Sequence, residues 1–162
     1  MIPLRDNVRP NIIPFVTVAL IAANIAVFAV ELRWTPAELK KWVDVYGMIP
    51  ARFMAALDAG SLNPANYLPL ITNLFLHGGW MHIIGNLWFL WLFGFSVEYC
   101  LGHAHFLIFY FVCGIIANLT QIAFDPTSPI PIIGASGAVS GILGAYAICF
   151  PRAKIQTLVP LF

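Results

Sequence analysis

Four windows of this sequence carry no Asp, Glu, Lys or Arg, and they constrain the fold more than any other feature. Two of them cover residues 10–30 and 59–97. About 20 apolar residues are enough to cross about 30 Å of hydrocarbon as a helix. Over the whole chain 60% of the 162 residues are hydrophobic and 9% are charged, whereas soluble domains carry about 25% charged residues. The sequence therefore predicts an all-α polytopic membrane protein and excludes a soluble globular enzyme.

We expect four membrane spans, at roughly residues 11–31, 74–95, 106–124 and 134–150. The second charge-free window is too long for one helix, and its first part is rich in loop-forming residues. Three prolines within residues 125–131 end the third span, because proline cannot continue a helix. A cleaved signal peptide is the other interpretation of the first span, but the apolar region exceeds the usual length of about 7–15 residues.

Residues 33–68 form the longest polar stretch and are expected to be a structured loop. The run Thr35-Pro36-Ala37-Glu38 has the pattern of a capping box. It precedes a short amphipathic helix that carries Trp42 and Tyr46. A second short helix is expected over about residues 50–60, ended by glycine. Both helices suit the membrane interface, where Trp and Tyr are enriched, and an ordinary surface loop fits the same evidence.

The basic residues beside the spans predict the orientation of the chain. Arg5 and Arg9 precede the first span, and Arg152 and Lys154 follow the fourth. Because short cytoplasmic flanks are rich in Lys and Arg, both ends of this chain are expected in the cytoplasm. Since no targeting segment is recognised, the expected compartment is the bacterial inner (cell) membrane. The net charge of +1 excludes nucleic acid as a partner.

The three cysteines, Cys100, Cys113 and Cys149, lie in or beside apolar runs and lack CxxC spacing. This arrangement predicts neither a disulfide framework nor a zinc site.

Polar side chains inside two of the spans point to a functional site. His82 and Asn86 are four residues apart and so share one face of a helix. Ser136 opens the fourth span in a run of small residues, where Gly137 and Gly141 let a neighbouring helix approach closely. In most membrane helices such groups serve packing or line a cavity. Together they have a chemical logic: Ser136 offers a nucleophile, and His82, Asn86 and the Ser136 backbone N–H can donate to an oxyanion if the two spans are adjacent.

The same residues carry a resemblance to a known family. The run Gly134-Ala135-Ser136-Gly137 matches the GxSG motif of rhomboid intramembrane serine proteases. The run from His77 through His82 to Asn86 resembles the family's HxxxxHxxxN pattern. Further fits are the loop residues 46–53, similar to bacterial members, and a GxxxExxxG spacing at Gly94, Glu98 and Gly102. The resemblance covers nearly the whole chain.

The resemblance implies a role for each of these residues. Ser136 would be the nucleophile, His82 and Asn86 would stabilise the oxyanion, and the supporting residues would be His77, Gly134 and Gly137. The implied fold is a rhomboid-like helical bundle, with about four transmembrane helices present of a six-helix core. The implied function is that of a serine endopeptidase that cuts transmembrane segments of other proteins within the lipid bilayer. No metal or organic cofactor is implied.

The chain departs from the family in its histidines. Rhomboid proteases use a Ser–His dyad whose histidine comes from the last helix, whereas all four histidines here precede Ser136. His103 and His105 lie at the start of the third span, in the expected cytoplasmic turn. Residues 157–162 resemble the start of a fifth span. We therefore interpret the chain as a protease lacking its last two helices, and expect little or no peptidase activity from it alone, because a serine without its base is a poor nucleophile.

Three other functions stay open at this point. A non-catalytic rhomboid-like protein would bind membrane clients without cutting them, but it has no need of Ser136, His82 and Asn86 together. A haem-binding bundle would use His77 and His82, whose five-residue spacing puts the rings about 140° apart around a helix. A purely structural scaffold explains the small residues of the fourth span but not His82 and Asn86.

Overall fold

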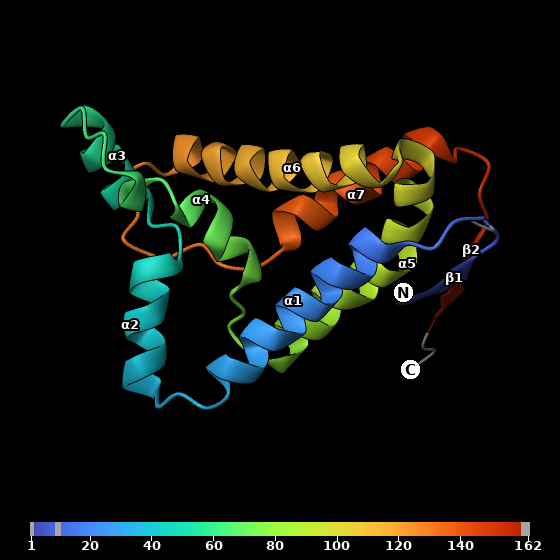
Figure 1. Ribbon diagram of the computed structural model, residues 1–162, viewed down its shortest axis with the longest axis horizontal. Helices are drawn as coiled ribbons and strands as arrows, with labels where there is room; N and C mark the ends of the chain where they lie inside the picture. Colours follow the sequence, from blue (N-terminus) through green and yellow to red (C-terminus); the bar gives the residue numbers. More distant parts are fainter. Residues whose placement is uncertain (1, 9–10, 160–162) are drawn as a thin grey trace.

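The computed structural model describes residues 2–8 and 11–159, and within them the chain is a bundle of helices with one small β-ribbon (Figure 1). The elements in order are β1 Ile2–Asp6, α1 Phe15–Glu31, α2 Pro36–Tyr46, α3 Pro50–Asp58, η1 Pro64–Asn66, α4 Pro69–Thr72, η2 Asn73–Phe75, α5 Trp80–Leu101, α6 His103–Phe124, α7 Ser136–Cys149 and β2 Ile155–Leu158.

Four apolar helices build the body of the molecule. Among the described residues, α5 and α6 are each 22 residues long and apolar enough to cross a membrane, and α1 and α7 are shorter apolar helices of 17 and 14 residues. In Figure 1, α1 lies alongside α5, α6 and α7 lie together, and α2 and α3 lie at the opposite end from the β-ribbon. The protein is thus a helical membrane bundle, as the composition predicts.

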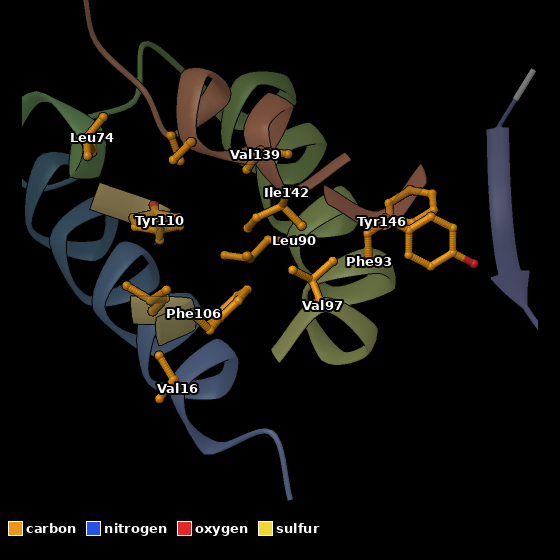
Figure 2. Close-up of a cluster of buried hydrophobic side chains, with 13 residues drawn as sticks. Val16, Leu74, Leu90, Phe93, Val97, Phe106, Tyr110, Val139, Ile142 and Tyr146 are labelled. Atoms are coloured by element: carbon orange, nitrogen blue, oxygen red, sulfur yellow. The ribbon is translucent and has the colours of Figure 1, made fainter. Parts of the chain in front are cut away.

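The core lies where α5, α6 and α7 meet. Leu90 of α5, Phe106 and Tyr110 of α6, and Ile142 of α7 are fully buried, each with 0% of its surface exposed, and Figure 2 shows them in one cluster. Near the β-ribbon the rings of Phe93 and Tyr146 meet edge to face, with centroids 4.8 Å apart. Because lipid tails are as apolar as these side chains, close packing rather than exclusion of water holds such helices together.

Small residues bring α7 close to α6. A Cβ added to Gly137 would collide with Ala117, and one added to Gly141 would overlap Cys113. Both glycines therefore face α6 one helical turn apart, and neither position has room for a side chain. The prediction that this pair allows a close helix approach is confirmed.

The segment between α1 and α5 begins as the sequence predicts. The capping box is present: the Thr35 hydroxyl accepts from the Glu38 N–H, and the Glu38 carboxylate accepts from the Thr35 N–H at 2.8 Å. Helix α3 ends at Asp58, and Gly60 follows with a φ of 59°. Trp42 stacks between Trp34 and Tyr46, with ring centroids 5.1 and 4.9 Å away.

Some predicted bounds differ from the structure. Helix α5 begins at Trp80 instead of residue 74 and ends at Leu101 instead of 95. The reason lies in the preceding chain: α4 and η2 are separate short turns, and Gly79 adopts a φ of 150°, which ends any continuous helix before Trp80. His77 therefore lies in a loop and not in the spanning helix. The other three helices begin or end within four residues of the expected spans, at Phe15–Glu31, His103–Phe124 and Ser136–Cys149.

Two further expectations are wrong. Cys100 and Cys149 form a disulfide, with Cα atoms 6.7 Å apart, because the ends of α5 and α7 meet. A pairing across 49 residues leaves no spacing signal in the sequence. Residues 155–158 form strand β2, paired antiparallel with β1, instead of beginning a fifth helix. Residues 160–162 of that expected span lie outside the described residues.

Candidate active site

Helix α5 presents His82 and Asn86 one turn apart at its first two turns. Asn86 is buried, with 7% of its surface exposed, and its Nδ2 atom has no hydrogen-bond partner within the described part of the chain. A buried amide nitrogen normally has a partner, so an unpaired one marks a place where a ligand can accept. The second oxyanion candidate, His82, lies on the same face of the helix.

The loop before α7 passes directly against these two side chains. Gly134 has a φ of 109°, and its N–H donates to the Asn73 carbonyl at 2.8 Å. A Cβ at Gly134 would overlap the His82 ring, at 2.7 Å from Cε1, and would lie 3.4 Å from Asn86 Nδ2. Both the backbone conformation and the close approach require glycine here. The first residue of the GxSG pattern is therefore what lets the histidine reach the main chain.

Ser136 follows two residues later as the first residue of α7, and its side chain is exposed. The first N–H groups of a helix have no partner inside the helix, and they lie at its positive dipole end. Ser136, His82 and Asn86 line one open cleft of about 360 Å³ between α5 and α7. Its other lining residues are Met81, Gly85, Phe89, Val139, Ser140 and Leu143. The two helices thus bring together the three residues singled out from the sequence.

One hydrogen bond of the His82 ring indicates which ring nitrogen carries its proton. The Gly78 backbone N–H donates to His82 Nδ1 at 3.4 Å, so Nδ1 is the acceptor. In a neutral imidazole the other nitrogen then carries the proton. That nitrogen, Nε2, is the one that lies against Gly134. His82 is therefore a donor toward the cleft.

His77 lies behind His82 and outside α5. Its ring meets the His82 ring edge-on, with centroids 5.0 Å apart, and its Nδ1 donates to the Phe75 carbonyl at 3.2 Å. Its Nε2 is buried and has no partner among the described residues. Burial and the neighbouring His82 lower the pKa of His77 from 6.5 to about 4, so the ring is neutral near pH 7.

Comparison with known proteins identifies the family. A family model described as the rhomboid domain matches residues 64–162, which include every residue of the cleft. The chain belongs to the rhomboid family.

Several relatives carry the family name. The chain is 41% identical to the rhomboid protease GluP of Bacillus subtilis over 76 residues, which cover 47% of this chain and 14% of that protein. It is 27% identical to the mitochondrial rhomboid protein 1 of Saccharomyces cerevisiae over 145 residues, or 87% of this chain and 38% of that protein. It is 32% identical to the mitochondrial presenilin-associated rhomboid-like protein A of Danio rerio over 112 residues, or 66% of this chain and 29% of that protein.

The names of these relatives divide between protease and rhomboid-like protein, so family membership alone does not assign catalysis. The chain also spans less than two fifths of the length of each of the three.

The remaining histidines of this rhomboid protein lie far from the cleft. His103 begins α6, where its Nδ1 contacts the Glu98 carboxylate, and His105 lies in the same first turn of the helix. Glu98 is beside the first turn of α1, since it accepts from the N–H groups of Val16 and Thr17. Within the described residues no histidine forms a hydrogen bond with the Ser136 hydroxyl.

Two polar contacts near the site were not predicted from the sequence. Asn73 and Asn118 exchange side-chain hydrogen bonds of 2.8 and 3.0 Å, and this buried pair anchors the loop that carries Gly134. Glu31, at the end of α1, accepts from the His77 backbone. The signal for Asn118 was present, because an amide inside a charge-free span is costly unless it has a partner. No sequence pattern indicated the Glu31 contact, because its partner is a backbone group.

A second cavity of about 410 Å³ lies on the other side of Ser136, beside the end of α6. Its polar lining includes Asn118, Gln121, Asp125 and Ser128. Ser136 therefore lines both spaces: the cleft between α5 and α7, and the cavity between α6 and the loop before α7.

Proposed function

We propose that this chain carries the nucleophile and the oxyanion-binding groups of an intramembrane serine endopeptidase. Its substrates are transmembrane segments of other membrane proteins. One observation supports this above the others: two N–H donors, His82 Nε2 and Asn86 Nδ2, lie against the main chain two residues before Ser136. Of these two donors, Asn86 Nδ2 is buried and has no partner among the described residues, so it is free to donate to an oxyanion.

In the proposed reaction, the nucleophile and the oxyanion-binding groups act on different atoms of the scissile peptide. Ser136 Oγ forms a bond to the carbonyl carbon of the scissile peptide while its proton passes to a base. The carbonyl oxygen becomes negative and accepts from His82, Asn86 and the Ser136 N–H. The C–N bond then breaks, and the amine leaves with the proton. Water hydrolyses the resulting ester and regenerates the serine. Each oxyanion donor lowers the barrier by about 3–4 kcal/mol.

His77, Gly134 and Gly137 support these groups in the proposal. His77 packs on the His82 ring, Gly134 leaves space for that ring, and Gly137 seats the first turn of α7 on α6. The base is assigned to a histidine outside these 162 residues, because His82 acts as an oxyanion donor in the proposal and no histidine of the described residues forms a hydrogen bond with the Ser136 hydroxyl. No metal or organic cofactor enters the scheme.

The proposal also covers the setting of the protein. We place both ends of this chain in the cytoplasm of a bacterial inner membrane, with the Ser136 cleft toward the opposite face. The basic flanks at Arg5, Arg152 and Lys154 support this orientation.

Cleavage of a model transmembrane substrate in liposomes tests the function. The full-length protein should cut it, Ser136→Ala should abolish cutting, and His82→Ala or Asn86→Ala should slow it by about 10²–10³-fold. The 162-residue chain alone should show little or no cleavage. Equal co-purification of an uncut substrate with the wild type and with Ser136→Ala would instead support a client-binding protein.

A further inference from the structure

Glu31 occupies a position where a carboxylate is unfavourable by itself. It is the last residue of α1, at the negative end of the helix dipole, and only 5% of its surface is exposed. An acidic group is destabilising at a helix C-terminus, and burial of a carboxylate adds to that cost. A compensating contact is therefore expected, and the structure shows which one it is.

Both oxygens of Glu31 accept from a single donor, the backbone N–H of His77, at 3.2 and 3.3 Å. This contact joins α1 to the loop before α5, across 46 positions of the sequence. A buried backbone N–H normally has a partner, and Glu31 supplies it for His77, so this contact anchors the loop at that residue.

The next peptide in the same turn controls His82. The Gly78 N–H donates to His82 Nδ1, and a Cβ placed on Gly78 would lie in ordinary contact with that atom and with Ile133. The turn at residues 77–78 is thus held between Glu31 on one side and His82 on the other. Movement of this turn would withdraw the donor from Nδ1.

We propose that Glu31 is a positioning residue for the oxyanion site. By holding the His77–Gly78 turn, it keeps the Gly78 N–H on His82 Nδ1 and so keeps the His82 proton on Nε2, which lies beside Gly134 in the wall of the cleft that Ser136 also lines. The inference rests on the proposed function for its catalytic consequence, but the tautomer that it assigns to His82 is a property of the structure alone.

Nitrogen-15 NMR of histidine-labelled full-length protein in micelles tests the tautomer directly. The wild type should show His82 as a single Nε2–H species. Glu31→Ala should add a detectable Nδ1–H population and lower kcat by about 10-fold or more with KM unchanged, as outer partners of site residues commonly do. Glu31→Gln retains an acceptor oxygen of the same reach and should restore both toward the wild type.

Glu98→Ala is the matched control. Glu98 is also a buried carboxylate that accepts backbone N–H groups of α1, but at the opposite end of that helix. This variant should be less stable and keep the wild-type His82 tautomer. If Glu31→Ala does not fold, Glu31→Asp keeps the carboxyl group, shortens the reach by one methylene and should show the same mixed tautomers.

Two results separate the possible failures. A wild-type tautomer and kcat in Glu31→Ala and Glu31→Asp, with only a lower unfolding temperature, would overturn the inference and leave Glu31 a purely structural residue. No cleavage by the wild type would overturn the proposed function, and the NMR spectra would still decide the role of Glu31.

Discussion

The two ends of α5 differ in how completely their polar groups are paired. At its C-terminal end, the fully buried Glu98 carboxylate accepts from Val16, Thr17 and His103, and the disulfide from Cys100 ties α5 to α7. At its N-terminal end, Asn86 Nδ2 is buried and unpaired within the described residues, and so is Nε2 of the nearby His77. Unpaired buried groups cost stability, so the C-terminal end contributes more to the bundle, and the unpaired groups of the other end fit the proposed oxyanion site.

The largest effect is expected from filling the space beside Gly134, at the N-terminal end of α5. Gly134→Ala should lower the cleavage rate of the full-length protein by about 10²–10³-fold, because the new methyl group displaces His82 and removes an oxyanion donor. The measurement is cleavage of a transmembrane substrate in liposomes. Gly144→Ala is the control, since a Cβ there meets no atom within 4 Å. Activity within twofold of the wild type in Gly134→Ala would contradict the proposed geometry.

The second-largest effect is expected at the C-terminal end of α5. Glu98→Ala should lower the free energy of unfolding by about 3 kcal/mol, because the N–H groups of Val16 and Thr17 lose their acceptor inside the bundle. Denaturant titration in mixed micelles measures this change. Glu98→Gln keeps the shape and one acceptor oxygen and should lose less. An unchanged free energy of unfolding would show that the hydrogen bonds of Glu98 do not stabilise the C-terminal end of α5.

The disulfide should contribute less than Glu98. Replacing Cys100 and Cys149 by serine should cost about 2 kcal/mol, the lower part of the usual range. The reason is that α5 and α7 remain packed through Phe93 and Tyr146, so the cross-link restrains little additional freedom. Thermal unfolding in micelles measures the change, with Cys113→Ala as the control for the free cysteine. A loss of cleavage at a temperature where the double variant is folded would mean that the two ends of α5 are coupled.

The smallest expected effect is a pH dependence of the stability, caused by His77 near the N-terminal end of α5. The folded pKa of His77 is about 4, below its usual 6.5, so the unfolded chain takes up the proton first as the pH falls. This contribution to stability is complete above about pH 6.5 and is lost between about pH 6.5 and pH 4. Unfolding temperatures across that range should fall in the wild type and fall less in His77→Gln. His105→Gln, at an exposed histidine of α6, should keep the wild-type slope.

Local features of the sequence determined the helices and part of their packing. The charge-free windows predicted the four apolar helices, and the Thr35–Glu38 pattern predicted the capped start of α2. The glycine pair of α7 predicted the close approach of a neighbouring helix, which the structure shows to be α6. These succeeded because each depends on residues within a few turns of one another. The motif residues Ser136, His82 and Asn86 were also named from the sequence, and the structure places them in one cleft.

Only the tertiary structure decided the contacts between distant residues. The start of α5 at Trp80, the disulfide, the Asn73–Asn118 pair and the Glu31–His77 contact all lay beyond the sequence patterns. The physical reason is that the partners are 45 to 49 positions apart in the three pairings, and in the last of them one partner is a backbone N–H that every residue but proline possesses. The side-chain types limit what can pair, but the arrangement of the helices selects which groups meet.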